Sequence, residues 1–179
     1  SLIALFLDVT YDTSLIFINN HNIILTNRNK DWRIFMIREA TIQDLASLNH
    51  LLFQVNNVHA DERPDLFQHG SKKYTDEQLI QVIQDDTRPI FVYEDHLHQI
   101  LGYVFCIEQH HYENKKTLYI DDLCVDEKCR GQHIGKQLYE YVLNYAKTQH
   151  YYHVTLNVWC LNESAMKFYE KCGMTPLKI

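Results

Sequence analysis

The stretch that decides the fold of this chain is Leu123-Cys-Val-Asp-Glu-Lys-Cys-Arg-Gly-Gln-His-Ile-Gly-Lys-Gln-Leu138. It reads as the end of a strand, a short polar loop and the start of a helix. Gly131 and Gly135 let the main chain approach an anion closely, and the N–H groups of the helix start can donate to it. Arg130 and Lys136 add positive charge beside the positive end of the helix dipole. The pattern predicts a pyrophosphate site, although a loop with a solvated, charged rim would carry the same residues.

Two other phosphate-binding motifs do not fit this stretch. A Walker loop has the form G-x-x-x-x-G-K-[ST], but Gly131 and Gly135 are too close together and Gln137 follows Lys136. A dinucleotide fingerprint needs G-x-G-x-x-G after a preceding βαβ half, and neither is present. The position of the loop between a strand and a helix is therefore the informative feature.

The segments on either side predict alternating strands and helices. A strand at 37–40 leads into a helix capped by Thr41 that ends at Pro64, and Thr75 and Gln78 form a capping box before a second helix. The remaining predicted elements are strands at 88–93, 100–107 and 117–125, a helix at 134–147, a strand at 153–159 and a helix at 163–172. Antiparallel strands followed by a crossover predict an α/β fold of mixed α+β type, with a twisted mixed sheet and helices on both faces.

The composition shifts near Met36. Residues 1–35 are rich in Ile, Leu, Phe and Asn, and the segments 14–18 and 23–26 flank a run of Asn residues that predicts a β-hairpin. We therefore divide the chain into an N-terminal extension, 1–35, and a functional domain, 36–179.

The overall composition is that of an ordinary globular domain with a negative charge balance. The 179 residues include 17 Lys and Arg against 23 Asp and Glu, a net charge of −6, and 46% of them are apolar. A chain of this length buries roughly 70% of its unfolded surface, so it needs no disulfide or metal to hold it together. No basic run is present, which argues against a nucleic-acid partner, and the negative field favours a cationic substrate.

The cysteines and the apolar segments indicate the cellular compartment. The five cysteines form an odd set without a C-x-x-C pair, which argues against a secreted disulfide framework and a thiolate zinc site. The apolar run at 2–7 is far shorter than the roughly 20 residues of a membrane helix, and no basic residue precedes it as in a signal peptide. We therefore expect a cytoplasmic protein without a membrane partner.

Three motifs together resemble the GNAT acetyltransferase superfamily. They are Arg130-Gly-Gln-His-Ile-Gly135, Asn162-Glu-Ser-Ala165 and Phe168-Tyr-Glu-Lys-Cys-Gly173, within a resemblance that spans about 36–173. The resemblance implies a mostly antiparallel mixed sheet in which the strand before the loop splays from its neighbour to receive the pantetheine arm of acetyl-CoA. It also implies that acetyl-CoA is the cosubstrate. The residues implied to bind it are Leu123, Cys124, Val125, Arg130, Gly131, Gln132, His133, Ile134, Gly135, Lys136, Asn162, Ala165 and Phe168.

This sequence departs from the family pattern at two places. His133 stands where the family has its middle glycine; histidine is tolerated at positive φ and adds a donor, but its bulk could weaken the grip on phosphate. The chain stops at Ile179, which leaves an abbreviated C-terminal hairpin, and we expect residues 1–35 to cover the sheet edge left there. Asn162 has a second interpretation as an ordinary helix N-cap.

Acetyl transfer to an amine needs a proton acceptor, because an amine with a pKa near 10.4 is almost wholly protonated at neutral pH. Asp121 and Asp122 precede the implied thioester-binding segment, and the pleat of a regular strand sends them to opposite faces. We favour Asp121 as the base and hold Asp122 in reserve; both could instead serve only structural contacts. The resemblance implies that Tyr169 protonates the departing thiolate, although a core aromatic would have the same spacing.

The acceptor pocket is the least determined part of the site. The resemblance implies that His59, Arg63, Asp65 and Phe67 line it, although a solvated loop would carry the same residues. Asn157 stands where some protein N-terminal acetylases have a glutamate, which argues for small amines instead of protein N-termini.

These observations predict an N-acetyltransferase that uses acetyl-CoA and acts by direct attack of a small, cationic primary amine on the thioester. Two alternatives stay open: a CoA-binding sensor or interaction domain without turnover, and a protein N-acetyltransferase. None of the eleven histidines has the spacing of a strong metal site, so we expect no metal ion. The formation of a homodimer is left open.

Overall fold

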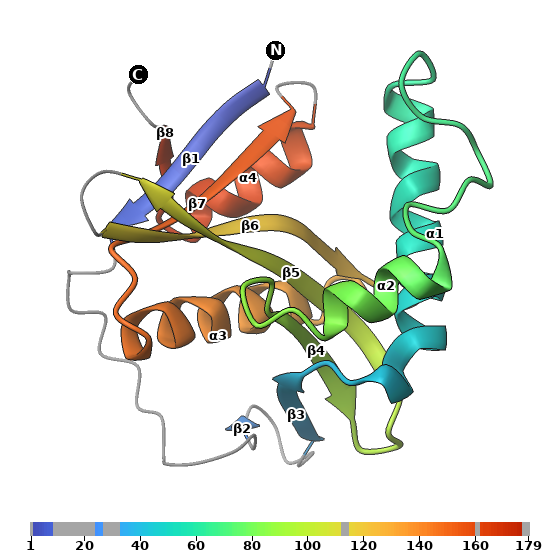
Figure 1. Ribbon diagram of the computed structural model, residues 1–179, viewed down its shortest axis with the longest axis horizontal. Coiled ribbons are helices and arrows are strands. Elements are labelled where there is room, and N and C mark those ends of the chain that lie inside the picture. Colours follow the sequence, from blue (N-terminus) through green and yellow to red (C-terminus); the bar gives the residue numbers. More distant parts are fainter. Residues whose placement is uncertain (1, 9–23, 27–32, 112–114, 160–161, 177–179) are drawn as a thin grey trace.

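The computed structural model describes residues 2–8, 24–26, 33–111, 115–159 and 162–176 (Figure 1). The described strands form one sheet in the order β2-β3-β4-β5-β6-β7-β1-β8. Strands β6 and β7 run parallel, and the other described pairs are antiparallel. The predicted mixed, mostly antiparallel sheet is thus confirmed.

The bounds of the elements lie close to the predicted ones from residue 75 onward. The strands are β1 (Leu2–Asp8), β2 (Ile24–Thr26), β3 (Arg33–Glu39), β4 (Ile90–Asp95), β5 (Ile100–His111), β6 (Lys115–Val125), β7 (His153–Trp159) and β8 (Thr175–Pro176). The helices are η1 (Ile42–Asp44), α1 (Leu45–Glu62), α2 (Asp76–Ile83), η2 (Glu127–Cys129), α3 (Ile134–Thr148) and α4 (Glu163–Lys171).

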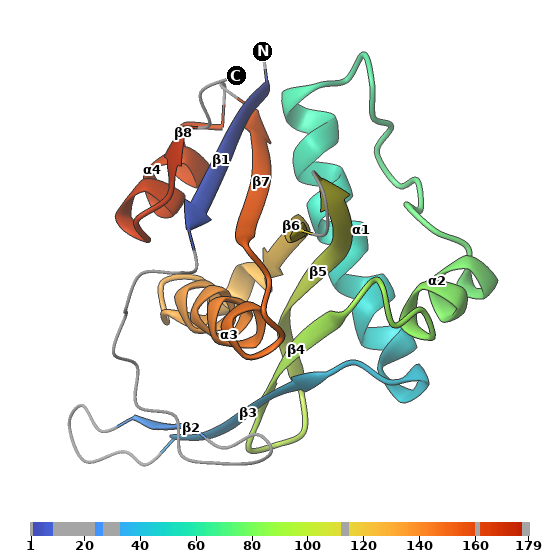
Figure 2. The same ribbon diagram turned by 60° about the vertical axis from the view of Figure 1, so that its left-hand side comes forward.

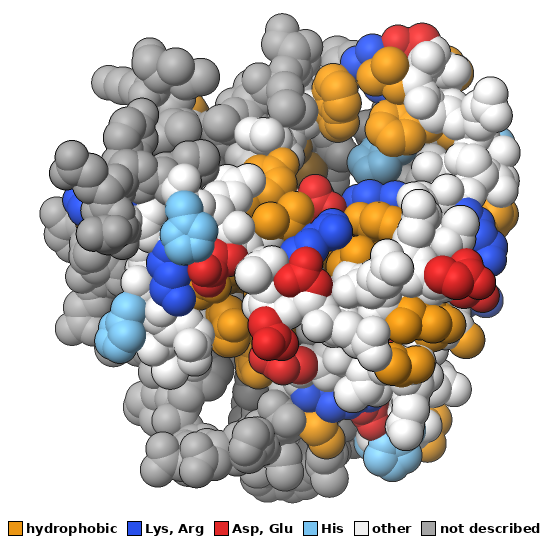
Figure 3. Space-filling view, in the orientation of Figure 1, with side chains coloured by type: hydrophobic (Ala, Val, Ile, Leu, Met, Phe, Trp, Pro, Cys, Tyr) orange, Lys and Arg blue, Asp and Glu red, His pale blue; other side chains and the backbone are white. Residues whose placement is uncertain are grey.

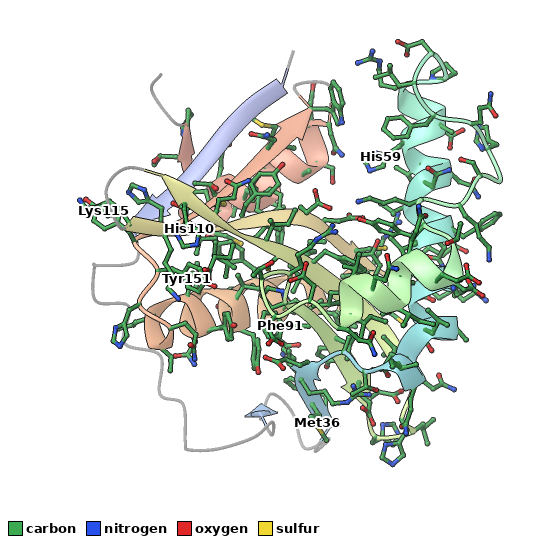
Figure 4. The ribbon with its side chains drawn as sticks, viewed as in Figure 1. Met36, His59, Phe91, His110, Lys115 and Tyr151 are labelled. Atoms are coloured by element: carbon green, nitrogen blue, oxygen red, sulfur yellow. The ribbon has the colours of Figure 1, made fainter. Side chains whose placement is uncertain are left out.

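Helices cover both faces of the sheet, as predicted. Figure 2 shows α1 and α2 on one side of the strands and α3 and α4 on the other. The alternation along β4 explains this arrangement, because Ile90 and Val92 pack in the core with α1 and α2, whereas Phe91 packs in the core with α3. The Phe91 ring lies 5.0 Å from the ring of Tyr141 and 4.8 Å from that of Tyr145 (Figure 4).

The first helix begins differently from the prediction. Thr41 was expected to cap an α-helix directly, but a 3₁₀ turn comes first and α1 begins at Leu45. Asp44 accepts a hydrogen bond from the Thr41 N–H at 2.7 Å and forms two hydrogen bonds with the Arg38 guanidinium. An ion pair with a strand residue thus determines where this helix starts.

Both described strands of the N-terminal segment belong to the main sheet. Leu2–Asp8 (β1) pairs along the whole of β7 and also pairs with β8. Ile24–Thr26 (β2) pairs with β3 at the opposite edge. The predicted hairpin partner at 14–18 lies outside the described residues. β1 therefore lies between β7 and β8 in the sheet. None of the helices in the described part of the chain is long and apolar enough to cross a membrane.

Candidate active site

Strands β6 and β7 separate along their length. Their parallel register runs from Thr117 opposite His153 to Ile120 opposite Leu156 and ends there. Beyond that point, the described residues 121–125 of β6 and 157–159 of β7 have no register with one another. The splayed pair that the family resemblance implied is present.

A β-bulge in β6 lies at the point where the strands separate. Phe105 pairs with Asp122 and Cys106 pairs with Ile120, so Asp121 is an extra residue without a partner in the register. A bulge bends its strand and shifts the alternation of side chains by one position. The bulge therefore reorients every side chain between Asp121 and the loop.

This shift puts both aspartates on one face of the sheet. Leu118 before the bulge and Leu123 after it both pack in the core with α3, although they are an odd number of residues apart. Asp121 and Asp122 consequently both face α1 and α2, where Nζ of Lys73 lies 3.1 Å from Oδ2 of Asp121 and 3.8 Å from Oδ2 of Asp122. The prediction that the two carboxylates point to opposite faces is wrong, because it assumed an uninterrupted pleat.

Asp122 is the more buried of the two carboxylates. Its side chain is 10% exposed, against 25% for Asp121. Its Oδ2 accepts a hydrogen bond of 3.0 Å from the hydroxyl of Tyr103. Burial raises the pKa of Asp122 above its usual value, and the charge of Lys73 only partly opposes this rise. Asp122 thus binds a proton more readily than an ordinary aspartate.

Lys73 supplies the positive charge at this place. Burial works to lower the pKa of Lys73, but the charges of Asp122 and Asp121 outweigh it and hold that pKa above its usual value. The residue comes from the segment between α1 and α2, and sequence reasoning did not single it out. On the face seen in Figure 3, acidic and basic side chains of the described residues lie next to one another near the middle.

The loop after β6 has the backbone that anion binding requires. Gly131 has a φ of 78° and His133 a φ of 64°, so both lie in the left-handed region. Histidine is among the residues that tolerate this conformation, so His133 can stand where the family has a glycine. His133 is the N-cap of α3, and the first hydrogen bond within this helix runs from the Gln137 N–H to the His133 carbonyl. The N–H groups ahead of Gln137 in the first turn have no partner within the helix and can donate to a phosphate.

A cavity of about 800 Å³ lies over this loop and the splayed end of β6. Its lining includes every residue proposed to bind acetyl-CoA except Gln132. It also includes residues that sequence reasoning missed, namely Val55, Val58, Cys129, Ser164, Lys171 and Cys172. Val55 and Val58 are three residues apart and so lie on one face of α1. Nothing in the surrounding sequence indicates that this face borders a cavity.

Tyr169 lines the same cavity and is also a core residue. Its side chain is buried, and its ring lies 5.0 Å from the ring of Phe168 and 6.1 Å from that of Tyr139. Burial, and then the charge of Asp122, raise the pKa of Tyr169 well above its usual value. The phenol therefore stays protonated at neutral pH.

Asn162, like Tyr169, has a structural contact and also lines the cavity. Its side chain accepts a hydrogen bond of 3.0 Å from the Ala165 N–H, so it is the N-cap of α4, and it also lines the cavity. The helix-cap interpretation is confirmed, whereas a contact with pantetheine stays a prediction.

The four residues predicted for the acceptor pocket cluster at the end of α1, outside the lining of this cavity. Nε and Nη2 of Arg63 donate to the two carboxylate oxygens of Asp65 at 2.8 and 2.7 Å, and the rings of His59 and Phe67 lie 5.2 Å apart. The Arg63 guanidinium also lies 4.9 Å from the ring centre of Trp159 at the end of β7. Figure 4 shows His59 on the side of α1 that faces the strands.

No group of three or more His, Cys, Asp and Glu side chains in the described part of the chain is arranged to hold a metal ion. The ionisable groups at the bulge are instead paired with one another. The site therefore presents a carboxylate pair on one face of the splay, a buried phenol in the cavity and a helix start whose first N–H groups have no partner within the helix.

Comparison with known proteins agrees with this arrangement. Residues 52–174 match the model of the acetyltransferase (GNAT) family. The chain is 32% identical over 149 residues to the glucosamine 6-phosphate N-acetyltransferase of Arabidopsis thaliana, a match that covers 81% of this chain and 93% of the relative.

Two solved structures extend the comparison. A tetramutant of the BH1408 protein from Bacillus halodurans has 32% sequence identity and a TM-score of 0.73, and the match covers 80% of this chain and 96% of that one. The crystal structure of glucosamine-6-phosphate N-acetyltransferase from Arabidopsis thaliana has 27% identity and a TM-score of 0.61, with 81% and 94% of the chains covered.

Proposed function

Since this chain is an N-acetyltransferase of the acetyltransferase (GNAT) family, we propose that it transfers an acetyl group directly from acetyl-CoA to the primary amine of a small molecule. The observation that carries the proposal is the continuity of the site. The lining of the cavity includes residues of the loop after β6 as well as Leu123, which directly follows Asp122 in the sequence. A donor bound along this cavity would bring its thioester next to the carboxylate pair.

The donor would be held mainly by main-chain groups. The first-turn N–H groups of α3, with Arg130 and Lys136, provide the donors and positive charge that a pyrophosphate requires. The apolar side chains of Leu123 and Val125 on β6 and of Phe168 on α4 provide a wall for the pantetheine arm. Acetyl-CoA is the general donor of this family, and the lining of the cavity fits its chemistry.

Asp122 is the base that the geometry favours over Asp121. It takes a proton from the acceptor ammonium, directly or through a water molecule, because its burial makes it the better proton acceptor. The neutral amine then attacks the thioester carbon, the C–N bond forms and the C–S bond breaks. Tyr169 gives a proton to the thiolate and recovers one from the attacking nitrogen, and the proton on Asp122 passes to solvent. Asp121 helps to hold the ammonium beside Asp122.

The acceptor class follows from the charges at the bulge and from the relatives. Two adjacent carboxylates on one face form a subsite for an ammonium group, and Lys73 occupies it in this structure. The plant relative acts, by its name, on glucosamine 6-phosphate. An amino sugar phosphate is therefore the first acceptor to test, before amino acids, polyamines and aminoglycosides.

Steady-state release of the CoA thiol with each of these amines tests the proposal. We expect acetyl-CoA to bind saturably and at least one small amine to stimulate thiol release. A peptide with a free N-terminus belongs in the same panel, and its preference over the small amines would favour a protein N-acetyltransferase. Tight binding of acetyl-CoA without amine-stimulated release would favour a sensor and would contradict the proposal.

A further inference from the structure

The side chain of Lys73 lies where the proposed acceptor ammonium would lie. Its Nζ is 3.1 Å from Asp121 and 3.8 Å from Asp122, and both carboxylates face it because of the bulge in β6. We propose that Lys73 is itself an acetyl acceptor, so that the protein acetylates its own Lys73 from acetyl-CoA when no free amine occupies the site. This proposal rests on the proposed function.

The other lysine ion pairs described in the structure do not share this placement. Lys72 and Lys167 pair with Asp76 and Glu163 on helices, and Lys116 pairs with Glu108 on β5. Lys136 lines the cavity but pairs with Glu140 on its own helix, α3. Among these five lysines, Lys73 alone pairs with the carboxylates that directly precede Leu123, a residue of the cavity wall. Its position is thus specific to the site and does not reflect a general abundance of surface lysine.

The chemistry is the proposed reaction with a different amine. The ammonium of Lys73 gives a proton to Asp122, its Nζ attacks the thioester carbon, and the C–N bond forms as the C–S bond breaks. The departing thiolate takes a proton from Tyr169, the second proton lost by the attacking nitrogen restores Tyr169, and the proton on Asp122 passes to solvent. The products are acetyl-Lys73, CoA and one proton. The side chain of Lys73 is 36% exposed and lies in a segment outside the helices, which gives its flexible stem room to move.

Acetylation would change the site as well as the lysine. A neutral amide cannot form the ion pair with Asp121 and Asp122, so the carboxylates would be released for a free acceptor. In the unmodified protein, a free amine and Lys73 compete for the same two carboxylates. A free acceptor should therefore slow the acetylation of Lys73.

Incubation of the full chain with acetyl-CoA alone, followed by intact-mass measurement and peptide mapping, tests the proposal. Lys72 is the matched control, because it is the adjacent lysine and reports uncatalysed acetylation. We expect Lys73 to be modified roughly 10²-fold faster than Lys72, the lower end of the effect of a positioned base. The first-order rate should not depend on protein concentration, because the transfer occurs within one chain.

Two variants separate catalysis at the site from simple exposure. Asp122→Asn should slow the acetylation of Lys73 to the rate of Lys72. Asp76→Asn breaks the ion pair of Lys72 and should leave the acetylation of Lys73 fast. The panel amine with the highest turnover should slow modification of Lys73 in the unsubstituted protein, a measurement that does not depend on how Asp122→Asn folds.

Equal rates at Lys72 and Lys73, or a rate at Lys73 that the free amine does not change, would overturn the proposal. Turnover of a free amine without any acetyl-Lys73 would overturn it while the proposed function stands. If neither Lys73 nor any amine of the panel is acetylated, both proposals are wrong.

Discussion

The hydroxyl of Tyr103 donates a hydrogen bond of 3.0 Å to Oδ2 of Asp122. Tyr103 is fully buried on β5, and Asp122 lies on the neighbouring strand at the bulge. The bond connects a rigid core ring to the carboxylate proposed as the base. The orientation of Asp122 is thus determined by how β5 and β6 pair, and this relationship is open to a direct test.

The substitution Tyr103→Phe should move the acid limb of the pH profile of kcat/KM to higher pH. The hydrogen bond favours the ionised form of Asp122 and lowers its pKa, so its loss raises that pKa, and the base is protonated at a higher pH. A hydrogen bond to a charged group contributes about 1.5–3 kcal/mol and one pKa unit corresponds to about 1.4 kcal/mol, so the expected shift is about one unit or more.

Tyr151→Phe is the matched control for that experiment. The hydroxyl of Tyr151 also donates to a carboxylate, that of Glu108 on β5, at 2.5 Å. Glu108 pairs with Leu118, four residues before Asp122 on β6. The profile should not move in this variant. An unshifted acid limb in Tyr103→Phe would show that Asp122 is not the group that titrates.

Replacing Tyr169→Phe should lower kcat by roughly 10²-fold, because it removes the proposed proton donor and keeps the aromatic ring. Binding of acetyl-CoA, measured by titration calorimetry, should change little. Tyr139→Phe is the control, since the buried Tyr139 hydroxyl has no hydrogen-bond partner among the described residues. Its removal should keep stability unchanged or raise it by about 1 kcal/mol. Full kcat in Tyr169→Phe would leave Tyr169 with a packing role alone.

Replacing Gly131→Ala should weaken the binding of acetyl-CoA. Gly131 has a φ of 78°, and a left-handed alanine costs about 1–2 kcal/mol, so the loop before α3 would relax away from its anion-binding form. Gly70 has a φ of 76° and lies outside the cavity lining. Gly70→Ala should therefore cost similar stability, measured by urea unfolding, and leave the dissociation constant unchanged. Equal losses of affinity in both variants would argue against this loop as the phosphate site.

Replacing Arg38→Met should destabilise the fold by about 3 kcal/mol, because it leaves two buried carboxylates without their cation. Arg38 pairs with Asp44 at 2.8 Å and with Glu94 at 2.6 Å. Burial works to raise the pKa of Asp44, but the hydrogen bonds from Arg38 and Thr41 and the charge of Arg38 together outweigh it, and that pKa lies below its usual 3.8.

The same ion pairs predict how stability changes with pH. A carboxylate with a lowered pKa contributes stability above its unfolded pKa, and this contribution is lost as the pH falls through the folded value. The pKa of Glu94 is likewise held below its usual 4.5, where burial is outweighed by hydrogen bonds from His98 and Arg38. In urea unfolding, the free energy of unfolding of the parent chain should decrease as the pH is lowered below about 4. The decrease should be smaller in Arg38→Met. Parallel curves would contradict this account.

Much of the site could be read from residues that are close together in the chain. The capping box of Thr75 and Gln78, the strand His153–Trp159 and the left-handed His133 all lie as predicted. Caps, turns and alternation depend on contacts within a few residues, so a single sequence carries their signals. The loop and helix residues that line the cavity are also predicted from local sequence, because they belong to three short motifs.

The sequence by itself determined the mixed sheet, the starts of α2, α3 and α4 and the loop of the cavity, since these depend on local backbone geometry and on short motifs. Only the tertiary structure decided that Asp121 and Asp122 share a face, that Lys73 lies between them and that β1 enters the sheet between β7 and β8. The alternation of a strand predicts a face only while its register is regular, and one extra residue at the bulge reverses it. Register and ion pairs between distant segments arise when those segments pack together, and no local pattern encodes them.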